Sequence, residues 1–286
     1  MSARILNGKE LAERIKNQLK DEVVQLKQKG HNPGLAVVIV GNDPASRIYV
    51  NFKKKDCADI GIESYEYALD ENISENELIS LIKELNKDVK VSGILVQLPL
   101  PKHINEEKVI SAIDPSKDAD CFHPENVGRL MTGNPVFMPC TPAGVMELLK
   151  DSGTEISGKE CVVVGRSNIV GKPQAILLLA ENGTVTVCHS RTKDLEAVCR
   201  RADILVVAIG KPEFIKATAV KPGAVVIDVG VNRVGEKKIV GDVEFEPVSE
   251  VASILTPPTG GVGPMTRAVL MENTVKAAKI QAGLDD

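Results

Sequence analysis

The sequence predicts an α/β protein of two domains whose sheets are largely parallel. Short β-branched apolar runs alternate with stretches of helical spacing through most of its 286 residues. The chain is longer than a common single domain, and 43% of its residues are hydrophobic, enough to form two cores. A proline-rich segment without a sustained period, 114–140, separates two series of strands and helices. These observations favour an N-terminal α/β domain followed by a doubly wound parallel-sheet domain.

The first series begins with an N-terminal stretch in which charged residues alternate with Leu, Ile and Val at helical spacing. Its expected strands are 35–41, 64–69 and 93–101, the last of which is stopped by prolines. Helical patterns follow the first two strands, at 45–59 and from Ser74 onward. Ser74 and Glu77 have the spacing of a capping box, which predicts where the second of these helices begins.

The helical pattern resumes at 141–153, where Thr141 is expected to cap the helix and Pro142 to fit its first turn. The expected strands of the second series are 160–165, 185–190, 203–210 and 224–230, and a helix is expected at about 171–182. The final stretch, 265–283, predicts a long amphipathic helix that returns to the first domain. We therefore expect one domain over 1–140 and 266–286, and a second over 141–265.

Composition excludes several classes of function. A net charge of −4, 3% aromatic residues and the absence of Trp disfavour nucleic-acid binding. No apolar stretch is long enough to span a membrane. The six cysteines form no C-x-x-C pair, which predicts reduced thiols, a cytoplasmic location and no zinc site. Asp114, Asp118 and Asp120 lie close together in the sequence. A calcium-binding loop that started at one of these aspartates would lack the required glycine, the required glutamate or both, so no metal is expected.

The clearest chemical motif is VVVGRSNIVGKP, residues 162–173. A β-branched strand ends at Gly165 and a helix opens at Gly171, which places backbone N–H groups and a positive helix end where a pyrophosphate can bind. This is the arrangement of a Rossmann-like domain. Ser167 replaces the second glycine of the usual fingerprint, so an ordinary strand-to-helix turn remains an alternative on this pattern alone.

The end of the next strand distinguishes between cofactors. An NAD site carries an acidic residue about 20 positions after the glycines, where it binds the ribose 2′-hydroxyl. Here the corresponding residues, 188–192, include no carboxylate. The Ser190 hydroxyl and the Arg191 guanidinium suit a 2′-phosphate, and Arg166 offers a second guanidinium. NADP is therefore favoured, although Arg191 alone also fits a solvated loop charge.

A second motif, YVNFKKK, contains a lysine with two interpretations. Ser46, Tyr49 and Lys53 share one face of the expected helix, which follows the carboxyl end of a strand. Gln97 lies near the carboxyl end of another strand and can converge on Lys53. A lysine partly withdrawn from water there is suited to general acid–base catalysis, with the neutral amide to orient it. Most lysines are solvated, and the pattern alone leaves that alternative open.

Taken together, the motifs resemble one family over essentially the whole chain, the bifunctional methylenetetrahydrofolate dehydrogenase/methenyltetrahydrofolate cyclohydrolases. The resemblance rests on SRIYVNFKKKDCADIGI, GILVQLPLP, DPSKDADCFHPENVGRL, PCTPAGVMELL, VVVGRSNIVGKP, CHSRT, GDVEF and GGVGPMT, in that order. It implies NADP-dependent oxidation of 5,10-methylenetetrahydrofolate and hydrolysis of the methenyl product to 10-formyltetrahydrofolate. It also implies a homodimer formed through the nucleotide-binding domain, and a place in the one-carbon metabolism that supplies purine biosynthesis.

The resemblance assigns roles to matching positions. Lys53 is expected to be the general acid/base, Gln97 its partner, Tyr49 a catalytic residue that shapes the folate pocket, and Asp120 an acceptor for the pterin ring. The remaining expected substrate-binding residues are Ser46, Leu98, Pro99, Gly261 and Pro264. The expected cofactor-binding residues are Thr141, Gly165, Arg166, Ser167, Ile169, Gly171, Ser190, Arg191, Thr192 and Val231. The segment 256–266 is expected to close over the substrate, and Cys140 to be a packing residue rather than a nucleophile.

The chain departs from the family pattern at two positions. Cys121 stands where members commonly have glycine, and Thr259 where they commonly have proline. Neither change removes an acid, a base or a charge, so they affect substrate affinity or loop rigidity more than reaction type. Rival readings are a shikimate-type or amino-acid dehydrogenase, a non-catalytic NADP-binding module, and a dehydrogenase without cyclohydrolase activity.

Overall fold

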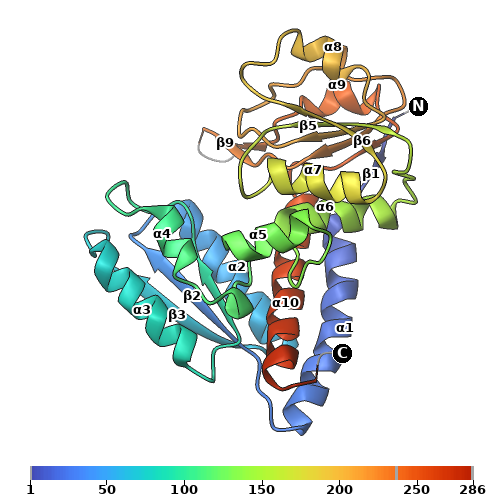
Figure 1. Ribbon diagram of the computed structural model, residues 1–286. Coiled ribbons are helices and arrows are strands. Elements are labelled where there is room, and N and C mark those ends of the chain that lie inside the picture. The colour runs from blue at the N-terminus through green and yellow to red at the C-terminus, as the bar shows by residue number, and fades with distance from the viewer. Residues whose placement is uncertain (1, 236–237, 285–286) are drawn as a thin grey trace. The chain divides into compact units, whose positions relative to one another are not determined.

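The computed structural model describes residues 2–235 and 238–284, which form two compact units (Figure 1). One unit comprises residues 14–138 and 267–286 and contains a three-stranded sheet; we call it the three-stranded unit. The other comprises residues 1–13 and 139–266 and contains a six-stranded sheet; we call it the six-stranded unit. The expected first domain included residues 1–13, but β1 (Arg4–Ile5) pairs with β11 (Ile254–Leu255), which places these residues in the six-stranded unit.

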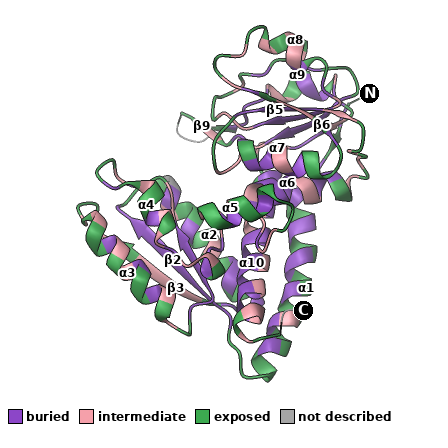
Figure 2. Ribbon diagram, in the orientation of Figure 1, coloured by how far each residue is buried: buried purple, intermediate pink, exposed green. Residues whose placement is uncertain are grey.

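In the three-stranded unit, β2 (Gly34–Val40) lies between β3 (Glu63–Leu69) and β4 (Gly93–Val96), and both pairings are parallel. Every residue of β2 and β4 is buried, because helices cover both faces of the sheet. The carboxyl ends of these strands therefore lie at one edge of the sheet. Figure 2 shows β2 as buried ribbon and the neighbouring helices with alternating buried and exposed positions, whereas no residue of β3 is buried.

The helices of this unit are α1 (Gly8–Gln28, from residue 14 onward), α2 (Pro44–Ile60), α3 (Glu75–Lys87), α4 (Glu106–Ser111), α5 (Pro124–Met131) and, from residue 267, α10 (Val262–Gln281). A 3₁₀ turn, η1 (Pro115–Lys117), precedes α5. One face of the sheet packs through Val38 and Ile94 against Leu78 and Ile82 of α3 and Val109 of α4. The predicted capping box at Ser74 and Glu77 is confirmed.

The six-stranded unit has the strand order β1, β11, β8, β7, β5, β6, and all of these pairings are parallel. The central strands are β5 (Glu160–Val164), β6 (Thr184–Cys188), β7 (Ile204–Val207) and β8 (Val225–Asp228). A separate antiparallel hairpin pairs β9 (Asn232–Val234) with β10 (Lys238–Val240). The predicted parallel sheet is thus confirmed.

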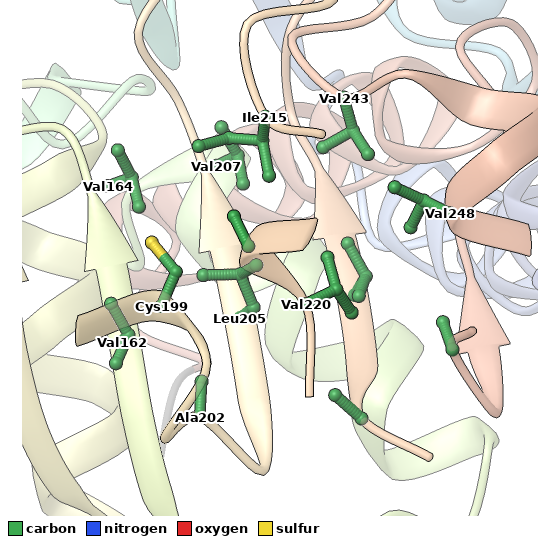
Figure 3. Close-up of a cluster of buried hydrophobic side chains, with 14 of the residues drawn as sticks. Val162, Val164, Cys199, Ala202, Leu205, Val207, Ile215, Val220, Val243 and Val248 are labelled. Carbon is green, nitrogen blue, oxygen red and sulfur yellow. The ribbon is translucent and has the colours of Figure 1, made fainter. Parts of the chain in front are cut away.

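Helices cover both faces of this sheet, as a doubly wound domain requires. The helices are α6 (Cys140–Asp151), α7 (Gly171–Ala180), α8 (Leu195–Cys199) and α9 (Phe245–Ser249), with a 3₁₀ turn, η2 (Ala217–Ala219). On one face, Val162, Leu205 and Val207 of the strands pack against Cys199 of α8 and Val248 of α9 (Figure 3). In Figure 1, α6 and α7 lie on the opposite face.

Two local predictions need correction. Helix α6 begins at Cys140 with Pro139 as the preceding cap residue, so Thr141 lies within the helix and does not cap it. Helix α5 lies inside the segment 114–140, which was predicted to be irregular; at eight residues it is too short for a clear period. The predicted C-terminal helix is confirmed, and its residues from 267 onward belong to the three-stranded unit. Among the described helices, none is both long and apolar enough to cross a membrane.

The core of the six-stranded unit yields a stability prediction. Leu205 is fully buried in the cluster of Figure 3, so Leu205→Ala removes buried methyl groups and leaves a cavity. We expect this substitution to lower the free energy of unfolding by about 3 kcal/mol. Leu179→Ala on α7 is the matched control, because Leu179 is 61% exposed. Urea denaturation followed by circular dichroism measures both, and an equal effect of the two substitutions would contradict the packing described.

Candidate active site

Helix α2 positions the candidate catalytic lysine. It follows β2, and Asp43 starts it by accepting a hydrogen bond from the Ser46 backbone N–H at 2.7 Å, with Pro44 in the first turn. Gly61 ends it in the left-handed conformation, with a φ of 88°. Lys53 therefore lies on a helix with a defined start and stop, at the carboxyl edge of the three-stranded sheet.

Lys53 meets Gln97, as the sequence predicted they could. The Lys53 Nζ donates a hydrogen bond to Gln97 Oε1 at 3.0 Å. Gln97 Nε2 donates to the Leu98 carbonyl oxygen at 2.8 Å, and the Gln97 backbone N–H donates to Val38 O at 2.8 Å. The lysine only donates and the carbonyl only accepts, so the two partners fix which end of the amide faces Lys53. Lys53 is half-buried, in contrast to the exposed Lys54 and Lys55.

A buried ion cluster, which the sequence analysis missed, lies one helical turn beyond Lys53. Asp56 is 4% exposed and contacts two cations: Lys16 Nζ lies 2.9 Å from its Oδ1, and Arg267 Nε lies 2.7 Å from its Oδ2. The Arg267 contact is an ion pair whose angle does not meet the requirement of a hydrogen bond. The Arg267 guanidinium also stacks 4.7 Å from the centroid of the Phe52 ring. These contacts attach α2 to α1 and α10.

The other residues predicted to bind folate are divided between the two units. In the three-stranded unit, Tyr49 is 40% exposed, Ser46 is buried, and Asp120 is half-buried. Leu98 and Pro99 directly follow Gln97 and are joined by a cis peptide bond. Gly261 and Pro264 belong to the six-stranded unit.

Asp118, two residues before Asp120, organises the acidic loop. Its carboxylate accepts hydrogen bonds from the backbone N–H groups of Phe122 and His123 at 3.1 and 2.8 Å, and from Asn126 Nδ2 at 2.9 Å. Burial raises the pKa of this carboxyl above its usual range. Asp118 thus holds the loop in place. The sequence pattern alone did not distinguish this structural role from the ligand-binding role predicted for Asp120.

The departure at Cys121 has a structural consequence. Its backbone φ is 61°, in the left-handed region where glycine fits without steric cost and other residues do not. The side chain is buried, and its thiol donates to the Phe137 carbonyl oxygen at 3.3 Å. A glycine at this position would relieve the backbone and lose that contact. Thr259, the other departure, is exposed.

The glycine turn of the six-stranded unit leaves no room for larger side chains. Gly165 has a φ of 136°, and a Cβ there would lie 2.3 Å from the Ala208 carbonyl oxygen. A Cβ on Gly171 would lie 2.3 Å from the Gly165 carbonyl oxygen. Ser167 Oγ accepts hydrogen bonds from the backbone N–H groups of Val170 and Gly171 at 3.2 and 3.3 Å. The serine that replaces the second glycine therefore stabilises the turn.

A pocket of about 320 Å³ opens beside this turn. It is lined by Val164, Gly165, Arg166, Ser167, His189, Ser190, Leu195, Ala208, Ile209, Lys211 and Phe214. No carboxylate is among these residues, whereas Arg166, Lys211 and the Ser190 hydroxyl suit a phosphate. The tight glycines and the cationic lining fit a dinucleotide that carries a 2′-phosphate.

The structure gathers four predicted cofactor residues in this lining: Gly165, Arg166, Ser167 and Ser190. Arg191 and Thr192 directly follow the lining, and Thr192 Oγ1 accepts a hydrogen bond from the His189 backbone N–H at 2.9 Å. Thr141, Ile169, Gly171 and Val231 are not part of the lining. The Thr141 hydroxyl lies 3.0 Å from that of Thr266 instead, so α6 and α10 meet there.

The cysteines and the other possible metal ligands among the described residues form neither a disulfide nor a metal-binding cluster. All six cysteines are buried and form no disulfide, and burial raises the thiol pKa of Cys57 and Cys199 to about 12 in each case. Across the part of the chain that the structure describes, no cluster of three or more His, Cys, Asp or Glu residues is placed to hold a metal ion.

Two family models match the chain. The tetrahydrofolate dehydrogenase/cyclohydrolase catalytic domain matches residues 6–120, and the NAD(P)-binding domain of the same family matches residues 139–282. The bifunctional protein FolD of Acetivibrio thermocellus is 73% identical over 282 residues, which is 99% of each chain.

Solved structures agree with the family models. The bifunctional dehydrogenase/cyclohydrolase FolD of Campylobacter jejuni superposes with a TM-score of 0.96 at 51% identity, covering 98% of this chain and 99% of that one. The Trypanosoma brucei enzyme, described as complexed with NADP cofactor and inhibitor, gives 0.95 at 40% identity and 99% coverage of both chains. The chain therefore belongs to the tetrahydrofolate dehydrogenase/cyclohydrolase family, as its motifs predicted.

Proposed function

We propose that Lys53 and Gln97 are the central catalytic pair of this bifunctional enzyme. The enzyme oxidises 5,10-methylenetetrahydrofolate with NADP and hydrolyses the resulting 5,10-methenyltetrahydrofolate to 10-formyltetrahydrofolate. The observation that carries the catalytic assignment is the 3.0 Å hydrogen bond from Lys53 Nζ to Gln97 Oε1 at the carboxyl edge of a parallel sheet. It supports a held lysine rather than a solvated one.

The two units have separate roles in this proposal. The six-stranded unit binds NADP in the pocket beside Gly165, and the three-stranded unit binds the folate near Lys53. The boundaries of the two matching family models support this division. When bound, NADP accepts the hydride that the methylene carbon of the folate loses. The contribution of the chain to that step is to bind and orient.

The hydrolytic step needs proton transfer, which is the proposed task of Lys53. Water adds to the methenyl carbon, the bond from that carbon to N5 breaks, one proton of the water moves to N5 and the other is released. Gln97 accepts one N–H of Lys53 and carries no charge, so it orients the amine without holding it in an ion pair. The ion cluster around Asp56 fixes the next turn of the same helix.

The remaining folate residues follow from the family resemblance. Asp120 is proposed to accept hydrogen bonds from the pterin ring, whose paired N–H donors suit a carboxylate. Tyr49, with 40% of its surface exposed, is available to pack against the ring system. Ser46, Leu98, Pro99, Gly261 and Pro264 are the other proposed substrate contacts. The organised loop around Asp118 supports the place given to Asp120.

For the cofactor, we keep all ten predicted residues as proposed contacts. Gly165, Arg166, Ser167 and Ser190 are supported by the pocket lining, and Arg191 and Thr192 by their adjacency to it. Thr141, Ile169, Gly171 and Val231 rest on the family resemblance. Cys140 stays a packing residue in this account, since it is buried at the start of α6.

We also propose a homodimer formed through the six-stranded unit, and a cytoplasmic location. Strand β6 forms one edge of that sheet, and Val187 on it and Leu179 on α7 are 39% and 61% exposed. An exposed edge strand with apolar neighbours favours pairing with a second copy. Six cysteines without a disulfide are typical of a reducing compartment.

Lys53→Met tests the catalytic assignment. We expect it to abolish hydrolysis of 5,10-methenyltetrahydrofolate, because methionine fills the space of lysine but transfers no proton. Absorbance loss of the methenyl compound measures this step without NADP. Lys55→Met on the same helix is the matched control, since the Lys55 side chain is 70% exposed and pairs with Asp59. Hydrolysis at the wild-type rate by Lys53→Met would refute the role of Lys53.

Arg191→Ala tests the choice of cofactor. Loss of a guanidinium from a 2′-phosphate site removes a charge-assisted hydrogen bond, so we expect NADP to bind about 10- to 100-fold more weakly, with NAD unaffected. Isothermal titration calorimetry with both dinucleotides measures the two affinities. Arg200→Ala, which removes an exposed arginine paired with Glu196, should change neither affinity. An equal loss for NAD and NADP would show that Arg191 does not recognise the 2′-phosphate.

A further inference from the structure

A fully buried carboxylate, Asp242, lies behind the wall of the cofactor pocket. It follows the β9–β10 hairpin and has no exposed surface. Its Oδ2 accepts hydrogen bonds from the backbone N–H groups of Ile209 and Gly210 at 2.7 and 2.9 Å. Its Oδ1 accepts one from the Lys211 N–H at 2.8 Å. Three consecutive backbone donors of one loop thus converge on a single side chain.

That loop forms one side of the pocket. Strand β7 ends at Val207, and Ile209 and Lys211 line the pocket together with Arg166 and Ser190. Gly210 between them has a φ of 64°, a left-handed conformation that helps to turn successive N–H groups toward the carboxylate. Asp242 itself is not in the lining. It therefore acts on the pocket only through the backbone that it holds.

The same carboxylate reaches a second segment of the proposed cofactor site. Asn232 Nδ2 donates to Asp242 Oδ1 at 2.8 Å, and Asn232 directly follows Val231, one of the proposed cofactor contacts. The intervening turn fits tightly, because a Cβ on Gly230 would lie 2.3 Å from the Asp242 carboxyl carbon. Asp242 thus joins the loops that follow β7 and β8.

A second buried carboxylate holds Asp242 in place. Asp228 Oδ1 accepts the backbone N–H groups of Asp242 and Gly230 at 3.0 and 2.9 Å, and its Oδ2 accepts the Val243 N–H at 2.9 Å. Burial, opposed by these N–H donors and reinforced by the nearby Asp242 charge, raises the pKa of Asp228 to about 7. Asp242 itself accepts hydrogen bonds from four N–H groups, three of the backbone and one of Asn232.

We propose that Asp242 is a positioning residue of the cofactor site: its carboxylate fixes residues 209–211 as the pocket wall against which the adenosine 2′-phosphate end of NADP binds. This inference rests on the proposed NADP site. Removal of the carboxylate leaves three N–H groups of the wall, whose hydrogen bonds are part-buried, without their acceptor, so the loop leaves its binding conformation. Cofactor affinity then falls, because only the fraction of molecules whose loop keeps the binding conformation can bind NADP.

Binding of adenosine 2′,5′-bisphosphate to full-length Asp242→Ala tests the proposal. We expect calorimetry to give an affinity at least about tenfold weaker than that of the wild type, with a similar loss for NADP. Hydrogen exchange of the 209–211 amides should accelerate in the same variant. Hydrolysis of 5,10-methenyltetrahydrofolate, which needs no NADP, should remain at the wild-type rate, which shows that the three-stranded unit is folded. Unchanged exchange of the β5 and β7 amides should show the same for the six-stranded sheet.

Asp203→Ala is the matched control. Asp203 also accepts a backbone N–H, from Glu160 at 3.0 Å, but it lies at the opposite, amino-terminal ends of β5 and β7. Its substitution should leave bisphosphate binding and the exchange of residues 209–211 unchanged. Asp242→Asn is the second variant, because it keeps the side-chain volume and one acceptor oxygen and should show a smaller loss than Asp242→Ala.

The outcomes separate the proposal from the function on which it rests. Failure of the wild-type protein to bind the bisphosphate or NADP would contradict the cofactor site itself. Wild-type affinity in Asp242→Ala, with hydrolysis retained, would overturn only the role of Asp242. Equal loss of binding and hydrolysis in both Asp242 variants would also overturn it, since Asp242 would then support the fold in general.

Discussion

The hydrogen bond between Lys53 Nζ and Gln97 Oε1 is the interaction on which the catalytic account depends. It exists because β2 and β4 are parallel neighbours, so that α2, which follows the first, and Gln97, which follows the second, meet at one edge of the sheet. The Gln97 backbone N–H donates to the Val38 carbonyl oxygen and so continues the hydrogen bonding between β2 and β4. The Gln97 side-chain Nε2 donates to the Leu98 carbonyl oxygen, which leaves Gln97 Oε1 directed at the lysine. A residue type that is usually solvated is thereby held at a defined position.

Buried charges shape this protein in two different ways. Around α2, Asp56 is balanced by the side chains of Lys16 and Arg267, an arrangement that fixes the helix because removal of one partner would leave a buried charge uncompensated. At the pocket proposed for the cofactor, Asp242 is balanced by N–H groups, mostly of the backbone, and so holds a loop rather than a helix. In both cases the buried carboxylate lies behind the groups proposed to touch ligands, where loss of one of its partners would be costly.

The sequence predicted the regular elements and suggested which residues contact ligands, but it missed the buried carboxylates behind those residues. Apolar runs such as 35–41 and the capping box at Ser74 have local signals, and the structure follows them closely. The strands β1 and β11 are two residues each, too short for any period to appear. Asp56 lies in a run of charges that is typical of a solvated face, and its partners Lys16 and Arg267 are distant along the chain. Asp242 was part of a quoted motif, GDVEF, but only tertiary contacts reveal that three N–H groups of another loop converge on it. Long-range pairing of this kind leaves no trace in spacing or composition.

A crystal structure of the protein with NADP and a non-hydrolysable analogue of 5,10-methenyltetrahydrofolate tests the central claim most directly. The account predicts that Lys53 Nζ keeps its hydrogen bond to Gln97 and lies within about one hydrogen-bond length, or one bridging water, of the analogue where the methenyl carbon meets N5. An analogue bound with that carbon beyond the reach of Lys53, and with the Lys53 ammonium directed into bulk solvent, would contradict it.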